Sequence, residues 1–288
     1  MLTLNNVSKR FEKKVAVDSF SIKLESGMVG LLGPNGAGKT SLMRMLSTLI
    51  EPTSGDISYN GIQWNNRNYN EIRKLLGYLP QKFSLYKNIE LIEALMHLAL
   101  LKGVTKDQLK REVFDVIEKV NLQDHINKKI GKLSGGMIRR LGIAQALLGD
   151  PKIIIIDEPT SGLDPDERIR FRGLLKSFSQ KSLVLVSTHI VEDIESTCDH
   201  VAIMNNGRLL VQGTTSDIAN YAEGKVWGKQ VTKEDFFKEG EKLNIISSQR
   251  VDDSFNIRML SELPVSGAIM LKPTLEDGYL SLIRKENV

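Results

Sequence analysis

The chain has 288 residues, of which 41% are hydrophobic and 26% are charged, and its formal net charge is +4. This length and composition exclude a peptide, a collagen-like fibre and a largely disordered chain, and they predict one large domain or a domain of about 200 residues with a small appendage. The longest apolar runs span only a few residues, the start lacks a signal-peptide pattern, and Cys198 is the single cysteine. We therefore expect no membrane-spanning helix, no secretion and a cytoplasmic location.

The first 50 residues are predicted to form strands followed by a helix. Apolar residues alternate in 2–4 and 20–24, and they run continuously through 28–32. From Lys39 they recur at helical spacing as far as Ile50, shortly before a proline. A glycine-rich segment lies between the last strand and this helix.

That segment matches the phosphate-binding pattern GxxxxGK[ST], with a strand before it and a helix after it as the pattern requires. It consists of Gly33, Pro34, Asn35, Gly36, Ala37, Gly38, Lys39 and Thr40, and Ser41 follows. The glycines let backbone N–H groups turn toward phosphates, and the helix N-terminus adds positive potential. Lys39 would reach the outer phosphates, and the Thr40 hydroxyl would ligate Mg²⁺.

Residues 88–149 are predicted to be almost entirely helical, with an apolar stripe along 109–120. Within them, Leu133-Ser134-Gly135-Gly136-Met137 precedes a helical stretch, so Ser134 lies at the N-cap position and the two glycines would allow an anion to approach closely. A simple capped helix explains this segment equally well. Residues 101–140 also carry excess positive charge, which fits a solvated helical surface, a nucleotide, acidic lipid or nucleic acid.

Two further apolar runs, 152–156 and 183–187, are typical of buried parallel strands, because a helical pattern follows each. Asp157 and Glu158 stand at the C-terminal end of the first run, where ligands bind in open α/β sheets. Asp157 is suited to hold Mg²⁺, and Glu158 to orient and deprotonate an attacking water. Capping of the next helix is the alternative role for these two acids.

The last part of the chain shows a change of pattern. Asn206-Gly207 between two apolar runs predicts a hairpin, and residues 223–288 are predicted to form a small module of their own. Its expected elements are three strands, at 225–231, 243–248 and 255–260, and a helix that starts after Thr274 and runs through Ile283.

The order of five motifs resembles the ATP-binding subunit of ABC transporters: GPNGAGKT, Gln81 in YLPQKFSLY, LSGGM, IIIIDEPTSGLD, and His189 after LVLVST. The resemblance covers about residues 2–220. It implies an α/β P-loop NTPase with a helical subdomain at about 82–150 and an antiparallel β subdomain, followed by the small C-terminal α+β module at 223–288. The implied activity is Mg²⁺-dependent ATP hydrolysis coupled to transport.

Several roles are implied by this resemblance alone. Phe11 would stack on the adenine of ATP, Gln81 would contact Mg²⁺ and the attacking water, and His189 would contact the γ-phosphate beside Glu158. Two copies would form a head-to-tail dimer, in which each ATP lies between the phosphate loop of one copy and the LSGGM segment of the other. The residues that would act across this dimer are Ser134, Gly135, Gly136 and Asp164. Without the resemblance, an isolated phenylalanine is typical of a core and an isolated histidine at a strand end is typical of a structural residue.

Met137 stands where the family usually has glutamine and cannot make the same hydrogen bonds. The segment PQKFSLYKNIELIEAL, which starts just before Gln81, and LEDGYLSLI near the end resemble exporter ATPases for drugs, lantibiotics or bacteriocins. This implies a separate polytopic membrane subunit as partner, a homodimer or pseudo-symmetric dimer of ATPase subunits, and a location on the inner face of the cell membrane. LEDGYLSL can equally be a capped amphipathic helix that packs on its own small sheet.

Two other functions fit parts of the sequence. One is a non-transport ABC-type ATPase, such as an iron-sulfur cluster assembly ATPase. The other is nucleic-acid binding through the basic segment 101–140. That segment contains a single aromatic residue, Phe114, so base stacking has little support and we expect no nucleic-acid partner.

Overall fold

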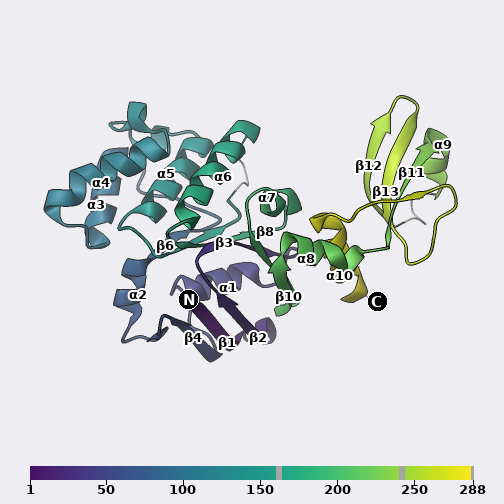
Figure 1. Ribbon diagram of the computed structural model, residues 1–288. Helices are drawn as coiled ribbons and strands as arrows, with labels where there is room; N and C mark the ends of the chain where they lie inside the picture. Colours follow the sequence, from purple (N-terminus) through teal and green to yellow (C-terminus); the bar gives the residue numbers. More distant parts are fainter. Residues whose placement is uncertain (160–163, 240–243, 287–288) are drawn as a thin grey trace. The chain divides into compact units, whose positions relative to one another are not determined.

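The structure is a computed structural model that describes residues 1–159, 164–239 and 244–286. It contains two compact units, Met1–Leu209 and Leu210–Val288 (Figure 1). Among the described residues, none of the helices combines the length and the apolarity needed to cross a bilayer.

The first unit is built around five parallel strands of a six-stranded sheet; the sixth strand, β10, contributes only its first two residues to this unit. In sheet order its strands are β10 (Arg208–Thr214), β9 (His200–Asn205), β3 (Gly27–Leu32), β8 (Leu183–Thr188), β7 (Ile153–Asp157) and β6 (Leu76–Leu79). Every residue of β7 and β8 is buried, which explains their continuous apolar runs. Because the strands are parallel, the loops after β3, β7 and β8 leave from the same edge of the sheet.

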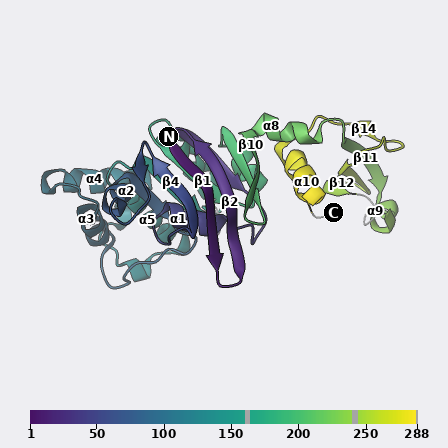
Figure 2. The ribbon, with the colours of Figure 1, turned by 90° about the horizontal axis from the view of Figure 1, so that it is seen from below.

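Helix α1 (Lys39–Leu46) contacts the parallel sheet through β7 and β8 and a second, antiparallel sheet through β2. The order of this second sheet is β2 (Lys14–Leu24), β1 (Leu2–Phe11), β4 (Ser54–Tyr59) and β5 (Ile62–Gln63) (Figure 2). Residues of both sheets and of α1 share one apolar core. The helix ends at Leu46 instead of continuing to Ile50, because Thr48 adopts a left-handed backbone conformation with φ 59°.

The other helices of the unit lie on the opposite face of the parallel sheet or beside it (Figure 1). α6 and α7 contact β3 and β8, and α5 contacts β6. α3, α4 and α5 contact one another and form the predicted helical insertion, in which Val113, Val116 and Ile117 of the apolar stripe are buried. The bounds are α2 (Tyr69–Leu75), α3 (Leu91–Leu101), α4 (Lys106–Lys119), η1 (Gln123–His125), η2 (Ile130–Lys132), α5 (Gly135–Leu147), α6 (Pro165–Ser179) and α7 (Val191–Glu195).

Lys102, at the end of α3, gives the first unit a pH-dependent stability. Its ammonium donates to the carbonyl oxygen of Leu76, and burial lowers the pKa of Lys102 to about 8. The unfolded chain then binds more protons than the folded chain between pH 8 and the ordinary lysine value of about 10.5, so the free energy of unfolding rises with pH across this range. At about 1.4 kcal/mol for each tenfold change in proton affinity, the buried charge disfavours folding by roughly 3 kcal/mol at pH 7.

We therefore expect Lys102→Met to raise the free energy of unfolding at pH 7 by about 1–2 kcal/mol, after allowance for the lost hydrogen bond. Chemical denaturation at pH 7, 8 and 10 measures this, with Lys106→Met on exposed α4 surface as the matched control. The rise in stability above pH 8 should be smaller in the Lys102 variant only. A less stable Lys102 variant with the wild-type pH slope would contradict the expectation.

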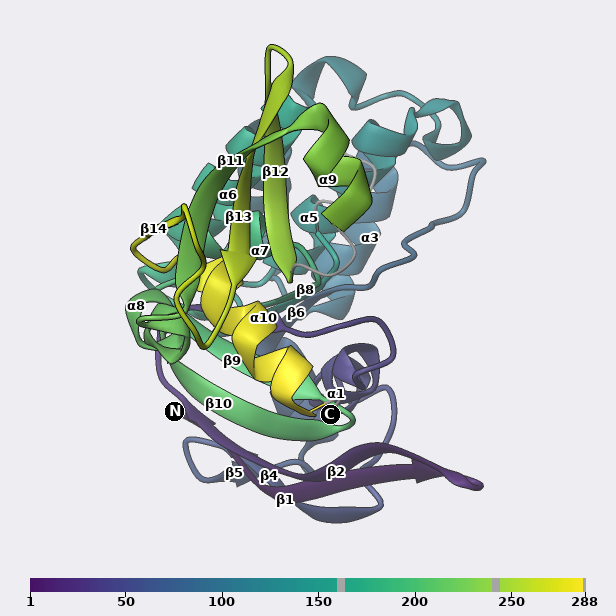
Figure 3. The same ribbon diagram turned by 90° about the vertical axis from the view of Figure 1, so that its right-hand side faces the viewer.

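The second unit consists of a four-stranded antiparallel sheet and helices that pack together (Figure 3). Its elements are α8 (Thr215–Ala219), η3 (Asn220–Ala222), β11 (Val226–Thr232), α9 (Lys233–Glu239), β12 (Ile245–Val251), β13 (Ser254–Leu260), β14 (Ile269–Met270) and α10 (Leu275–Glu286), and the strand order is β12-β13-β11-β14. The structure groups residues 210–222 with this unit, since α8 and η3 contact α10.

The last helix is tied to its own sheet, as one of the two interpretations of LEDGYLSL expects. The fully buried Asp277 accepts a hydrogen bond from the Thr274 backbone N–H at 2.6 Å and another from its hydroxyl at 2.9 Å, which caps α10. The same carboxylate pairs with Arg258 on β13, whose Nε lies 2.9 Å from Oδ1. These contacts join the last helix to the sheet within the second unit.

Candidate active site

The phosphate-binding pattern forms a tight loop between β3 and α1. Gly38 is the N-cap of α1 with φ 105°, and a Cβ there would lie 2.1 Å from the carbonyl oxygen of Ala16, so only glycine fits. A Cβ on Gly33 would lie 2.1 Å from the Met204 carbonyl oxygen. The loop is also held by the β9–β10 hairpin, because the N–H of Gly207 donates to the carbonyl oxygen of Ala37 at 2.9 Å.

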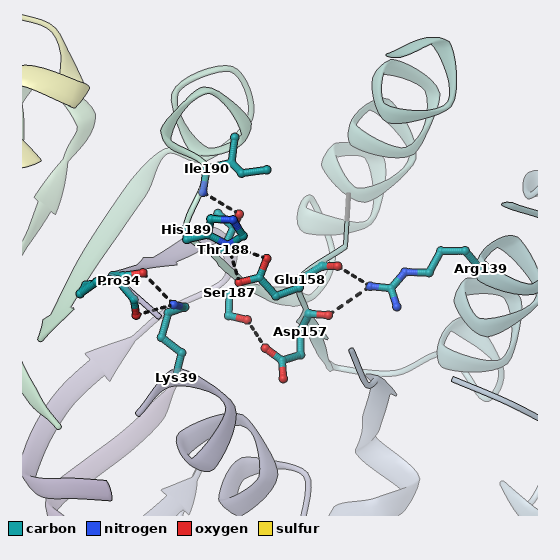
Figure 4. Close-up of polar contacts among 10 residues, drawn as sticks. Pro34, Lys39, Arg139, Asp157, Glu158, Ser187, Thr188, His189 and Ile190 are labelled. Carbon is teal, nitrogen blue, oxygen red and sulfur yellow. Dashed lines mark hydrogen bonds and ion pairs between the residues drawn. The ribbon is translucent and has the colours of Figure 1, made fainter. Parts of the chain in front are cut away.

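Lys39 closes this loop from the helix side. The residue is only 6% exposed, and its Nζ donates to the carbonyl oxygens of Gly33 at 2.7 Å and Pro34 at 3.1 Å (Figure 4). Burial lowers the pKa of Lys39, and attraction by the charges of Glu158 and Asp157 partly offsets this effect. The loop thus holds a cation next to the two carboxylates.

Asp157 lies at the end of β7 and is 1% exposed. Its Oδ1 accepts a hydrogen bond from the Ser187 hydroxyl, whereas its Oδ2 is buried and has no hydrogen-bond partner among the described residues (Figure 4). A buried carboxylate oxygen without a partner costs free energy unless a ligand compensates for it. A hard cation such as Mg²⁺ fits this oxygen.

The protein itself offers few ligands for such a cation. Nowhere in residues 1–159, 164–239 and 244–286 do three or more His, Cys, Asp or Glu side chains come close enough to hold a metal ion. Mg²⁺ at Asp157 would therefore need substrate oxygens as its remaining ligands, which is how Mg²⁺ binds in phosphate-transferring enzymes. Thr40, in the first turn of α1, is exposed and can contribute its hydroxyl.

Glu158 follows in a strained backbone conformation, with φ 52°. For a residue other than glycine this costs about 1–3 kcal/mol and is often found at functional sites. Its N–H donates to the Ser187 carbonyl oxygen at 3.0 Å, and its carboxylate lies 3.0 Å from Nδ1 of His189 (Figure 4). The side chain of His189 is 46% exposed, so the pair is open to a ligand on one side.

Arg139, which none of the sequence motifs indicates as a site residue, makes five hydrogen bonds at this site. Its guanidinium on α5 donates to main-chain carbonyl oxygens around Asp157 and Glu158 (Figure 4), and the residue is 8% exposed. A signal was present in the sequence, because Arg139 stands one turn before Gly142 and Ile143 on the buried face of its helix. A charge on such a face is rare unless it is paired.

The next three predicted residues lie in three different parts of the chain. Gln81 is exposed, and its main-chain oxygen accepts from Arg139 at 3.0 Å. Ser134 caps α5 by accepting from the N–H of Met137 at 3.3 Å. Phe11 is 43% exposed at the end of β1, with Nζ of Lys9 5.2 Å from its ring centre, so the core interpretation is wrong for this residue.

Two glycines and Asp164 complete the predicted set. Gly135 is exposed, and a Cβ built there meets no atom within 4 Å, so the start of α5 is open; Gly136 is partly buried. Asp164 caps α6 by accepting from the N–H of Glu167 at 2.8 Å. The preceding residues of its motif, 160–163, lie outside the described residues. None of the contacts in the described part of the chain brings Ser134, Gly135 or Asp164 to Lys39.

Comparison with known proteins gives consistent results. Residues 17–161 match the family described as ABC transporter. The chain is 37% identical over 228 residues to the uncharacterized ABC transporter ATP-binding protein YxlF of Bacillus subtilis (strain 168), over 79% of this chain and 75% of that protein. It is 34% identical over 226 residues to the linearmycin resistance ATP-binding protein LnrL of the same organism, over 78% and 72%. A solved structure described as the ATP binding subunit of an ABC transporter is 29% identical, with a TM-score of 0.71 over 76% of this chain and 92% of that chain.

Proposed function

The chain belongs to the ATP-binding subunits of the ABC transporter family, and from this premise we propose that it hydrolyses ATP as the motor subunit of an exporter. The observation that carries the proposal lies at one edge of the parallel sheet. A buried cation, a Glu–His pair and a carboxylate oxygen that has no hydrogen-bond partner among the described residues come together there. These groups belong to Lys39, Asp157, Glu158 and His189. Phosphoryl transfer needs little else from a protein than such positioning and charge stabilisation.

Each residue has a separate task in this proposal. Lys39 exchanges its two carbonyl partners for the outer phosphate oxygens of ATP, and the N–H groups of the loop bind the remaining ones. Glu158 orients the attacking water and accepts its proton, while His189 holds the carboxylate and contacts the γ-phosphate. Asp157, Thr40 and Gln81 would hold Mg²⁺, which when bound neutralises phosphate charge. Phe11, exposed at a hairpin, stacks on the adenine.

We propose that a second copy of the chain completes each site. Ser134 and Gly135 are exposed at the start of α5 and make no contact with the Lys39 loop among the described residues, so they are available to the nucleotide of a partner. The N-terminus of α5 supplies positive potential for the γ-phosphate. Closure of two copies around two ATP molecules would then bring together all groups needed for hydrolysis.

A mixing experiment tests the shared site. Lys39→Met removes the cation of the phosphate-binding loop. Gly135→Asp places a negative charge in open space at the start of α5, without a clash within the chain. Each variant alone should be inactive in phosphate release. An equimolar mixture should regain up to about a quarter of the wild-type rate, because half of random pairs are mixed and each has one intact site. No regain, with both variants folded and able to associate, would contradict the shared site.

The proposed role in transport is export out of the cell. It is supported by the similarity to a resistance ATP-binding protein and by the exporter-like segments around Gln81 and at the end of the chain. The membrane-spanning part would be a separate polytopic subunit, with this chain bound at the inner face of the membrane. Tagged chain captured from gently solubilised membranes should retain that subunit. Capture of soluble iron-sulfur proteins instead would favour the assembly type of ABC ATPase.

A further inference from the structure

Arg139 uses every N–H of its guanidinium on main-chain carbonyl oxygens. The group has five N–H donors, and five carbonyl oxygens lie within hydrogen-bond distance. The acceptors are Pro159 (3.3 Å from Nε), Pro80 and Gln81 (both 3.0 Å from Nη1), and Asp157 and Glu158 (3.1 and 2.6 Å from Nη2). No donor is left for a carboxylate. Although Asp157 and Glu158 carry charges nearby, Arg139 therefore binds the backbone that carries them and not the charges themselves.

These acceptors belong to two segments that are far apart in the sequence. Residues 80–81 follow β6 and carry Gln81, whereas 157–159 comprise the last residue of β7 and the two residues after it and carry both site carboxylates. Arg139 itself is on α5, one turn after the exposed Gly135. One planar side chain thus joins three elements of the site, and its rigid fork fixes their relative positions more narrowly than a flexible lysine could.

The bonds to 157–159 act on the strained residue of the site. Glu158 has its N–H bound to the carbonyl oxygen of Ser187 and its own carbonyl oxygen bound to Arg139. Both peptide groups that flank its left-handed φ of 52° are therefore fixed from outside. This conformation directs the carboxylate to His189, 3.0 Å away. Without Arg139, one of the two supports is lost and the side chain can turn away from the pair.

We propose that Arg139 is a positioning residue for hydrolysis, which sets the direction of Glu158 and links it to the segment of Gln81. Movement of the Gln81 segment is thereby transmitted to the general base within the same copy of the chain. This inference rests on the proposed ATPase function. It does not require that Arg139 touches ATP, since its donors are all engaged and the residue is almost completely buried.

The test compares Arg139→Lys and Arg139→Gln with Arg140→Gln as matched control. Arg140 is the next residue of the same helix, and its guanidinium pairs with Glu167 and reaches the carbonyl oxygen of Asn121, outside the 80–81 and 157–159 segments. We expect both Arg139 variants to lose about 10- to 100-fold in kcat per titrated nucleotide site, with KM for ATP within about threefold, because a small misplacement of a catalytic group is costly. Arg140→Gln should stay within about threefold in both constants.

Two outcomes overturn the inference while leaving the ATPase function intact. One is normal kcat per titrated site in the Arg139 variants, with only a lower melting temperature, which would make Arg139 a purely structural residue. The other is full activity of Arg139→Lys, which would show that the charge suffices and the fork does not matter. Arg139→Lys keeps the positive charge, so it remains informative if Arg139→Gln does not fold. Absence of ATP hydrolysis by the wild-type chain would instead refute the proposed function itself.

A double-mutant cycle tests the link to Gln81. Gln81→Ala should lower kcat markedly in the wild-type background, but much less in the Arg139→Lys background, where its segment is no longer fixed to that of Glu158. The same Gln81 substitution combined with Arg140→Gln should give additive effects. Additive effects in both backgrounds would show that Arg139 does not couple the two segments.

Discussion

Glu158→Gln should abolish turnover while leaving ATP binding nearly unchanged. The substitution keeps the shape of the side chain and its ability to contact His189 Nδ1, which lies 3.0 Å from the carboxylate in the wild type. It removes the group that accepts a proton from the attacking water. General-base catalysis contributes about 10²- to 10⁴-fold, so we expect kcat to fall by at least about 10²-fold. The phosphate-binding loop is untouched, and the ATP dissociation constant should stay within about threefold of the wild-type value.

The measurements are phosphate release and nucleotide affinity on the same protein preparation. The control is Glu192→Gln, the same chemical change at an exposed position of α7. A chain that binds ATP without hydrolysing it should also accumulate as a dimer, which size-exclusion chromatography with ATP can detect. Ordinary turnover in Glu158→Gln would exclude Glu158 as the general base. If Glu158→Gln instead lost both ATP binding and turnover, Glu158 would have a role in the folding of the strained segment at the end of β7.

The sequence predicts the parts of the site that depend on local patterns. The loop 33–40 is recognisable because a strand, glycines and a helix follow one another along the chain. Asp157 and Glu158 are recognisable because they end a run of four isoleucines. The parallel sheet then brings them to Lys39, since the ends of parallel strands lie at one edge.

Contacts between distant segments explain what the sequence could not show. Arg139 reaches Pro80 and Asp157, 59 and 18 residues away, and no local pattern encodes those bonds. Ser187, which binds Oδ1 of Asp157, looks like an ordinary end of a buried strand. Helical spacing of apolar residues also predicts an end of α1 at Ile50, which is too late, because Thr48 has already left the helical conformation.

Asp157→Asn should lower hydrolysis at every Mg²⁺ concentration, so that added Mg²⁺ no longer raises the rate. In the wild type, Oδ2 of Asp157 is buried without a hydrogen-bond partner among the described residues, and a cation is the ligand that suits it. The amide keeps the size of the side chain but offers a neutral and weaker metal ligand. Charge stabilisation by a metal ion supplies several kcal/mol in such reactions, so we expect kcat/KM to fall by about 10²- to 10³-fold at any Mg²⁺ concentration.

Ser187→Ala gives a graded comparison for this prediction. The hydroxyl of Ser187 holds Oδ1 of Asp157 but would not touch the cation, and loss of such an orienting partner typically weakens metal binding about 10- to 100-fold. The concentration of Mg²⁺ that half-saturates hydrolysis should therefore rise by about that factor, with kcat recovering at saturation, because the ligand itself is still present. Asp157→Asn should show no such recovery. If Asp157→Asn instead reached wild-type kcat at the wild-type Mg²⁺ concentration, Asp157 would not be the metal ligand, and its partnerless oxygen would require another explanation.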